Sequence, residues 1–366
     1  MTARIVFIFV VNLKLLIMKS ILEFCQIETP TKEQISALTS MEQFVDENNK
    51  EDFHILSGAA GTGKTTITTT LINYLNQKEI IYKICAPTGR AARILGRKSK
   101  TENSTIHSMI YSISTNPDNG FQICDLKQND ISEYQIYIID EASMISSINH
   151  IGNQFQTKDA LLVELLQFIK DGNPLNKVIF IGDQNQLTPV NEKQSRALDI
   201  SYLIERFTFQ GKKSILTEVK RQKENSIVLE NANRIRVAID NKSSNFITHG
   251  IETLNYSRSI KDYLTLLEKD NNDNVISIAC SAKMNFNFNQ RIRANRFLDS
   301  QNTIAIGDVL LVTQTWKRNG HKLFSGDHVK VIDFDLNDKI HRANLVFLPV
   351  KLEYKNIKNE KMIVLF

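Results

Sequence analysis

From residue 53 onward, short apolar runs alternate with segments in which apolar side chains recur every three or four positions. The runs predict buried strands at residues 53–57, 80–86, 135–140 and 177–182. The helical spacing at residues 67–75 and 161–169 predicts helices whose apolar faces lie on the core. Strands that alternate with helices are typical of a parallel sheet, so the pattern predicts an α/β fold class.

The segment from Tyr111 to Cys124 has a different pattern. Apolar and polar residues alternate on both sides of residues 116–120, which are Asn-Pro-Asp-Asn-Gly and favour tight turns. We therefore predict a β-hairpin inserted in the first domain, at about residues 108–130.

Beyond Gln222 the pattern predicts a second α/β domain. It comprises a helix near 226–240, a strand from Val275 to Cys280 and a helix from Asn285 to Leu298. After Gly307 the alternation indicates strands alone, at residues 309–313, 328–334, 345–352 and 362–366. This last part fits a small β-barrel-like insert.

Length and composition set the class of protein. A chain of 366 residues suits about two domains. Hydrophobic residues at 42% and charged residues at 23% exclude a disordered, collagenous or polytopic membrane chain. The net charge of +5 is compatible with an anionic partner without requiring one. The cysteines, Cys25, Cys85, Cys124 and Cys280, form no CxxC pair, which predicts neither disulfides nor a structural metal and favours a cytoplasmic location.

Residues 1–17 form an apolar extension. The run from Ile5 to Ile17 is shorter than a membrane span requires, and Lys14 interrupts it. No small-x-small cleavage site follows, so a signal peptide is not predicted. We expect no membrane association, and our hypothesis is that translation begins at Met18.

A phosphate-binding pattern, GxxxxGK[ST], lies between a predicted strand and a predicted helix. Its residues are Gly58-Ala59-Ala60-Gly61-Thr62-Gly63-Lys64-Thr65. In such a loop the backbone N–H groups face the phosphates, the lysine contacts the β- and γ-phosphates, and the hydroxyl of Thr65 binds Mg²⁺. We include Thr66 in the expected nucleotide site; the alternative is a glycine-rich turn that binds no nucleotide.

The strand expected at 135–140 ends in two adjacent carboxylates, Asp140 and Glu141. Beside a P-loop, Asp140 would hold Mg²⁺ through water and Glu141 would polarise the attacking water. Without a P-loop, such a pair is more often a solvated loop charge. Together with the P-loop it predicts ATP hydrolysis, with ATP and Mg²⁺ as cofactors.

Four further strings occur in an order that matches one family. They are Ala86-Pro87-Thr88-Gly89-Arg90-Ala91-Ala92, Thr105-Ile106-His107-Ser108, Gly182-Asp183-Gln184-Asn185-Gln186-Leu187-Thr188-Pro189-Val190 and Leu216-Thr217-Glu218-Val219-Lys220-Arg221-Gln222. They resemble motif Ia, the strand-contacting motif after it, motif III and motif IV of superfamily 1 helicases of the RecD/Dda-like branch. The resemblance extends from about residue 29 to about residue 330.

On the ATP side, the resemblance implies three roles. Gln34 would bind the adenine, Gln186 would sense the γ-phosphate, and Arg221 would be the arginine finger that stabilises transition-state charge. Taken singly, Gln34 is an exposed helix glutamine, and the Lys-Arg pair at 220–221 belongs to a solvated face.

On the DNA side, the resemblance implies contacts with single-stranded DNA and with DNA junctions. The expected contact residues are Pro87, Thr88, Arg90, Thr105, His107 and Phe121. The hairpin would be the strand-separating pin. Phe121 either stacks on a base or packs within the hairpin. Considered without its motif, His107 would be an ordinary partly buried histidine.

The resemblance also implies an organisation of the chain. A RecA-like domain is expected at 18–214, an incomplete second RecA-like domain at 215–306, and a truncated, SH3-like β-rich insert at 307–366. The family's motifs V and VI have no counterpart here, and the chain ends on the apolar residues 362–366. We expect a truncated reading frame or one half of a split protein.

Three functional hypotheses follow. The first is an ATP-dependent DNA helicase or translocase that moves 5′ to 3′, a direction implied by the resemblance. The second is a remnant that binds nucleotide or nucleic acid without motor activity. The third is a P-loop nucleotide kinase or another ATPase that does not act on DNA, which explains residues 58–65 and 140–141 alone. No protein partner is predicted.

Overall fold

The computed structural model of the chain describes most residues from Ser20 onward. The described ranges are 20–92, 96, 104–115, 122–149, 155–219, 227–243, 248, 250, 256–269, 275–297, 304–313, 316–318, 320–323, 325–342, 345–355 and 360–365. The apolar extension at 1–17 therefore lies outside them.

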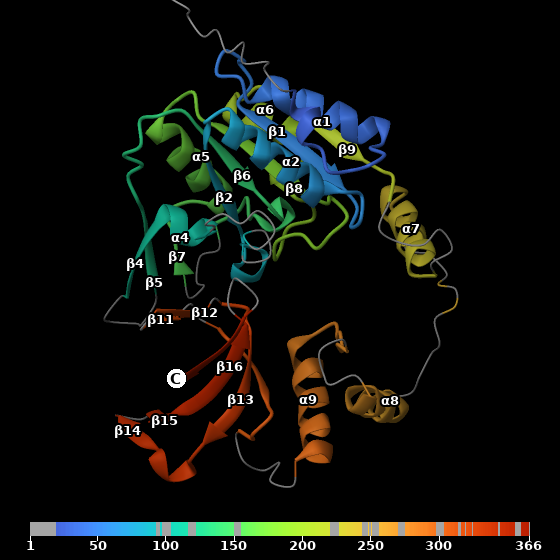
Figure 1. Cartoon of the computed structure of the whole chain (residues 1–366), viewed down its shortest axis with the longest axis vertical. Helices are drawn as coiled ribbons and strands as arrows, with labels where there is room; N and C mark the ends of the chain where they lie inside the picture. The colour runs from blue at the N-terminus through green and yellow to red at the C-terminus, as the bar shows by residue number, and fades with distance from the viewer. Residues whose placement is uncertain are drawn as a thin grey trace, which may run out of the picture.

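Six parallel strands form the central sheet of the first half of the chain (Figure 1). Across the sheet they are β3 (Ser104–Thr105), β2 (Ile81–Ala86), β6 (Gln135–Ile139), β8 (Lys177–Gly182), β1 (Phe53–Gly58) and β9 (Gly211–Leu216). Every residue of β1, β6 and β8 is buried, as in a sheet covered on both faces. The predicted α/β parallel-sheet fold of a P-loop NTPase is confirmed, and the four predicted strands agree with the structure to within one residue at each end.

Helices cover both faces of this sheet. On one face lie η1 (Ile21–Phe24), α1 (Lys32–Phe44) and α2 (Lys64–Gln77), and on the other lie α4 (Ile106–Ile110), α5 (Leu161–Gly172) and α6 (Ile200–Phe207). Side chains of β1 alternate between the two cores, with Phe53 and Ile55 on the α5 side and Leu56 on the α1 side. The two cores together fix the plane of the sheet.

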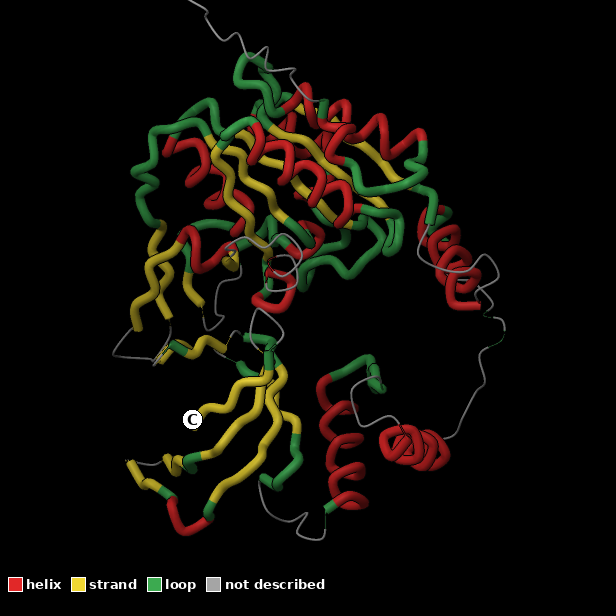
Figure 2. The backbone as a smooth tube through the Cα atoms, in the orientation of Figure 1, coloured by secondary structure: helices red, strands yellow, loops and turns green. Residues whose placement is uncertain are grey.

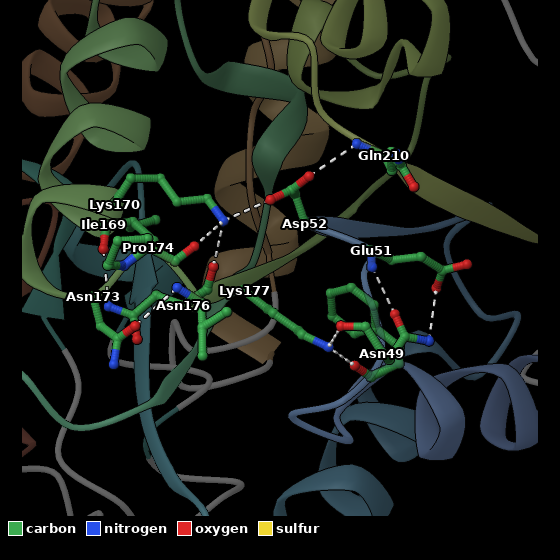
Figure 3. Close-up of polar contacts among 12 residues, drawn as sticks. Asn49, Glu51, Asp52, Ile169, Lys170, Asn173, Pro174, Asn176, Lys177 and Gln210 are labelled. Carbon is green, nitrogen blue, oxygen red and sulfur yellow. Dashed lines mark hydrogen bonds and ion pairs between the residues drawn. The ribbon is translucent and has the colours of Figure 1, made fainter.

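At the amino ends of the strands, two lysines join the loops to the sheet (Figure 3). The Lys177 ammonium donates to the carbonyls of Phe44, Asp46 and Asn49 at 2.7, 2.6 and 2.9 Å. Lys170 pairs with Asp52 at 2.7 Å, and the same carboxylate accepts a hydrogen bond from the Gln210 backbone N–H at 2.9 Å. These contacts hold the beginnings of β8, β1 and β9 side by side.

His54 is fully buried in β1. Its Nε2 lies 3.1 Å from the Ser214 hydroxyl of β9, and its Nδ1 has no hydrogen-bond partner among the described residues. Burial lowers the pKa of His54 from 6.5 to about 4. The histidine is therefore neutral in the folded protein.

Acid is expected to destabilise the protein through His54. Between pH 6.5 and 4 the unfolded chain binds a proton that the folded chain does not, so stability is complete above pH 6.5 and falls as the pH falls. The free energy of unfolding should drop by about 2 kcal/mol from this group between pH 7.5 and pH 5. Urea unfolding at both pH values measures it. In His54→Gln the drop should be smaller by that amount, and equal drops in both proteins would contradict the assignment.

The predicted hairpin is present. Strands β4 (Tyr111–Thr115) and β5 (Gln122–Leu126) pair antiparallel, and β7 (Phe155–Gln156) joins β5 in parallel. At the base of the hairpin the Tyr111 hydroxyl donates to the buried Glu164 carboxylate of α5. The predicted turn at 116–120 and Phe121 lie outside the described residues.

Beyond β9, the described residues up to 297 form three helices (Figure 2). They are α7 (Ile227–Asp240), α8 (Tyr256–Lys269) and α9 (Ala282–Arg296), of which α7 and α9 correspond to the predicted helices. The domain boundary predicted between residues 214 and 215 is wrong, because β9 continues to Leu216 and pairs with β1 along its whole length.

The strand predicted from Val275 to Cys280 is also wrong. These residues form no ladder with another strand in the described part of the chain, and Ile276 and Ile278 are 71% and 88% exposed. Alternating apolar residues favour a strand only where a neighbouring strand accepts its hydrogen bonds. The second RecA-like domain therefore stays a prediction.

The carboxyl-terminal part is built from strands. A four-stranded antiparallel sheet contains β10 (Val309–Leu311), β13 (His328–Phe334), β16 (Val350–Lys355) and β17 (Lys361–Leu365). Two hairpins accompany it, β11 (Trp316–Arg318) with β12 (His321–Leu323) and β14 (Ile340–Arg342) with β15 (Leu345–Phe347). The strand predicted at 345–352 is two strands, because Pro349 lacks the N–H that a ladder needs.

The β-rich part is joined to α9 by an ion pair. Arg293 contacts Asp308 with Nη2 at 3.0 Å and Nε at 3.1 Å. The SH3-like, barrel-shaped closure of this part stays a prediction.

Candidate functional site

The P-loop connects β1 to α2 at the carboxyl edge of the sheet. Gly61 and Gly63 have φ values of 87° and 96°, a region that favours glycine, and Gly63 is the N-cap of α2. A Cβ on Gly58 would lie 2.7 Å from the Leu216 carbonyl oxygen of β9. The glycine positions of the motif are therefore required by geometry, and the loop leaves the N-terminus of a 14-residue helix available to an anion.

Lys64 is the first residue of α2. Its ammonium donates to the carbonyls of Gly58 at 2.6 Å and Ala59 at 2.9 Å. Burial lowers the pKa of Lys64, whereas the charges of Asp183, Glu141 and Asp140 act in the opposite direction. The ammonium thus lies inside the loop, where it can exchange loop carbonyls for phosphate oxygens.

Gln34 is buried against the P-loop. Its Nε2 donates to the Thr62 carbonyl at 2.9 Å, and its Oε1 accepts from the Thr31 backbone N–H at 3.0 Å, which completes a capping box at the start of α1. A Cβ on Gly63 would lie 2.7 Å from that Nε2. Gln34 is therefore not an exposed helix glutamine, the alternative considered from the sequence alone. Adenine binding by Gln34 stays a prediction.

The neighbouring Glu33 contacts a different motif. Its carboxylate accepts hydrogen bonds from the Thr217 N–H at 2.7 Å, the Thr217 hydroxyl at 2.6 Å and the Glu218 N–H at 3.4 Å. These bonds, led by the hydroxyl of Thr217, lower the pKa of Glu33. Glu33 was not predicted as a site residue, although it lies inside the capping box, and it joins α1 to the string that continues to Arg221.

Asp140 and Glu141 follow β6. The Asp140 carboxylate accepts the Glu141 N–H at 3.0 Å, and Glu141 has a φ of 51°, which is uncommon for a residue with a side chain. Burial raises the pKa of Glu141, and the charge of Asp140 adds to this effect while Lys64 opposes it. A carboxylate with a raised pKa beside a P-loop lysine suits a general base.

Motif III begins beside the P-loop because β8 and β1 are neighbours. Gly182 is in register with Ser57, and Asp183 follows it with a side chain that is 6% exposed. The carboxylate of Asp183 lies 2.6 Å from Nη2 of Arg236 on α7. Gln186 is exposed at the same edge. Arg236 is a residue that sequence analysis did not single out.

The expected DNA-contact strings lie at the carboxyl ends of β2 and β3, which pair in parallel. Arg90 is exposed, and Pro87 and Thr88 are partly exposed. Thr105 caps α4 by accepting the Ser108 N–H at 3.1 Å. The His107 ring packs on Tyr111, with centroids 5.7 Å apart, and burial lowers the pKa of His107.

The structure therefore brings two sets of residues to one edge of the sheet. The first set contains Lys64, Asp140, Glu141 and Asp183, and the second contains the strings after β2 and β3. Phe121 and Arg221 lie outside the described residues.

The residues present fit a magnesium-bound nucleotide. The hydroxyl of Thr65 and the carboxylate of Asp140 are the hard oxygen donors that Mg²⁺ prefers, and a Cβ would obstruct the loop at Gly58. Bound Mg²⁺ would neutralise phosphate charge. Within the described ranges, no three or more His, Cys, Asp or Glu side chains form a group that could hold a metal ion by themselves, and no helix is long and apolar enough to cross a membrane.

Comparisons with known proteins show the family to which the chain is similar. The family model of the AAA domain matches residues 32–246, more than half of the chain. The ATP-dependent RecD2 DNA helicase of Deinococcus radiodurans is 30% identical over 139 residues, which cover 37% of this chain and 16% of that protein. The ATP-dependent DNA helicase dda of Enterobacteria phage T4 is 27% identical over 212 residues, 57% of this chain and 43% of that protein.

Among solved structures, Pif1 helicase from Candida albicans aligns with 93% of this chain and 79% of its own, at 19% identity and a TM-score of 0.44. The chain thus spans less than half the length of the two curated relatives named above.

Proposed function

We propose that this chain, which belongs to the AAA domain family, couples ATP hydrolysis to movement along single-stranded DNA and to duplex unwinding. It carries the motifs of RecD/Dda-like superfamily 1 helicases. The supporting observation is that the phosphate-site carboxylates and the strings after β2 and β3 share the carboxyl edge of one sheet. Ligands of open α/β sheets bind at this edge.

The side chains divide the work of hydrolysis. Lys64 binds the phosphates, Glu141 accepts a proton from the attacking water, and Gln186 senses the γ-phosphate from the loop after β8. In this proposal Arg221 supplies the transition-state charge and Gln34 lies next to the adenine. Each of these roles is carried by a residue of a matching motif.

DNA lies, in this proposal, across the ends of β2 and β3. Thr88, Arg90 and Thr105 contact its backbone, Pro87 and His107 line the same path, and Phe121 stacks on a base at the junction of single and double strands. A 5′ to 3′ direction follows from the resemblance of the motifs.

Single-stranded DNA is expected to raise ATP hydrolysis at subsaturating ATP by roughly tenfold or more, since two coupled sites typically change each other's affinity by this order. Phosphate release with and without an oligothymidylate measures the effect. Arg90→Ala should raise the oligonucleotide concentration needed for half-maximal stimulation, whereas Arg206→Ala, an exposed arginine on α6, should not. Hydrolysis that ignores DNA would favour another class of ATPase, and nucleotide binding without turnover would favour the remnant without motor activity.

A further inference from the structure

An arginine from a helix outside the sheet contacts the carboxyl edge of the sheet, where the P-loop lies. Arg236 lies on α7, and its Nη2 is 2.6 Å from the Asp183 carboxylate, the first residue after β8. The Arg236 side chain is 26% exposed, whereas that of Asp183 is 6% exposed. A nearly buried carboxylate paired with a partly accessible guanidinium holds that guanidinium in one orientation.

The position of Asp183 defines the end of the nucleotide that Arg236 faces. Ser57 and Gly182 are in register, so Asp183 follows β8 next to Gly58, the first residue of the P-loop. The ammonium of Lys64 donates to that Gly58 carbonyl at 2.6 Å. A P-loop lysine contacts the β- and γ-phosphates, so the ion pair lies at the terminal-phosphate end of the site.

Electrostatics agree with this placement. Asp183 is the carboxylate that most strongly favours the charged form of Lys64, and Arg236 disfavours it. Asp183 is therefore a counter-charge for both Lys64 and Arg236. An incoming polyphosphate would relieve the repulsion between these two cations.

Arg236 retains donors for a second partner. A guanidinium carries five N–H groups in a planar fork, and in the described part of the chain the bond to Asp183 uses one of them, through Nη2. The fork geometry matches phosphate oxygens, so Arg236 can keep its pair with Asp183 and donate to a phosphate at the same time.

We propose that Arg236 binds the terminal phosphate of ATP while Asp183 orients it, so that helix α7 responds to a triphosphate and not to a diphosphate. This inference rests on the proposed ATP-hydrolysing function and deepens it, because it names a residue that distinguishes substrate from product. A binding experiment without DNA and without hydrolysis can test this proposal.

Equilibrium binding of fluorescent mant-AMPPNP and mant-ADP, each with Mg²⁺, tests the proposal. Arg236→Gln should weaken mant-AMPPNP binding by about tenfold, the size of one charge-assisted hydrogen bond, and change mant-ADP binding less than about twofold. Arg236→Lys keeps the charge without the fork and should recover part of the loss.

Arg234→Gln is the matched control. Arg234 lies on the same helix but pairs with Glu230 at 2.8 Å, four residues earlier. This variant should bind both nucleotides as the unchanged protein does. Thermal melting of all three variants separates a loss of folding from a loss of binding, and if Arg236→Gln does not fold, Arg236→Lys carries the comparison.

Two outcomes would overturn the inference alone. One is an equal loss for both nucleotides in the folded Arg236 variants, which is the result expected if the ion pair merely docks α7. The other is no loss for either nucleotide. If the protein without substitutions bound neither nucleotide, the proposed ATP site itself would be wrong, and this inference with it.

Discussion

ATP turnover is expected to fall by about two to three orders of magnitude when Lys64 is replaced by alanine, the cost of removing one preorganised donor from a charged transition state. The Lys64 ammonium lies inside the P-loop, 2.6 Å from the Gly58 carbonyl and 2.9 Å from that of Ala59, where phosphate oxygens can replace these acceptors. Phosphate release at saturating ATP and Mg²⁺ measures the rate.

The control for Lys64→Ala is Lys83→Ala, an exposed lysine in the middle of β2. It should leave turnover unchanged. A melting temperature for Lys64→Ala close to that of the unchanged protein shows that the loop still folds. Turnover within a few-fold of the unchanged protein, in a folded Lys64→Ala variant, would rule out this loop as the site of hydrolysis.

Replacement of Glu141 by glutamine is expected to lower turnover by roughly 10²- to 10⁴-fold while nucleotide still binds, because glutamine has the shape of the base without its proton affinity. Burial and Asp140 raise the pKa of Glu141, so the unchanged enzyme should lose activity as the pH falls through a value above the ordinary one for glutamate. A pH–rate profile together with mant-ATP binding measures both effects.

Glu205→Gln, an exposed residue on α6, is the comparison for Glu141→Gln. It should retain both the rate and the acidic limb of the profile. If the Glu141→Gln variant kept an acidic limb identical to that of the unchanged enzyme, the limb would belong to another group and Glu141 would not be the base.

Much of the first domain could be predicted from its sequence because the determining interactions are local. A largely apolar run such as β8 is typical of a buried strand, and the P-loop motif specifies both the strand before it and the helix after it. Val275–Cys280 has an equally suggestive pattern but remains unpaired in the described residues, since a strand also needs a neighbour that lies far away in the sequence.

The positions of several candidate site residues were predictable to a similar degree. Lys64 begins α2 after β1, and Asp140 and Glu141 follow β6, two strands away at the same edge of the sheet. The partnership of Asp183 with Arg236 was not predicted, because it joins residues 53 positions apart with no fixed spacing. The contacts of Gln34 were not predicted either, since its sequence signal is that of a capping box and the bond to Thr62 depends on how α1 packs.

The first turn of α1 has a mechanical consequence. Two consecutive residues of one rigid turn hold two separate loops, because Gln34 bonds the P-loop at Thr62 and Glu33 bonds the segment after β9 at Thr217. The P-loop and the segment after β9 are therefore anchored to the same helical turn, so a displacement of this turn would move both.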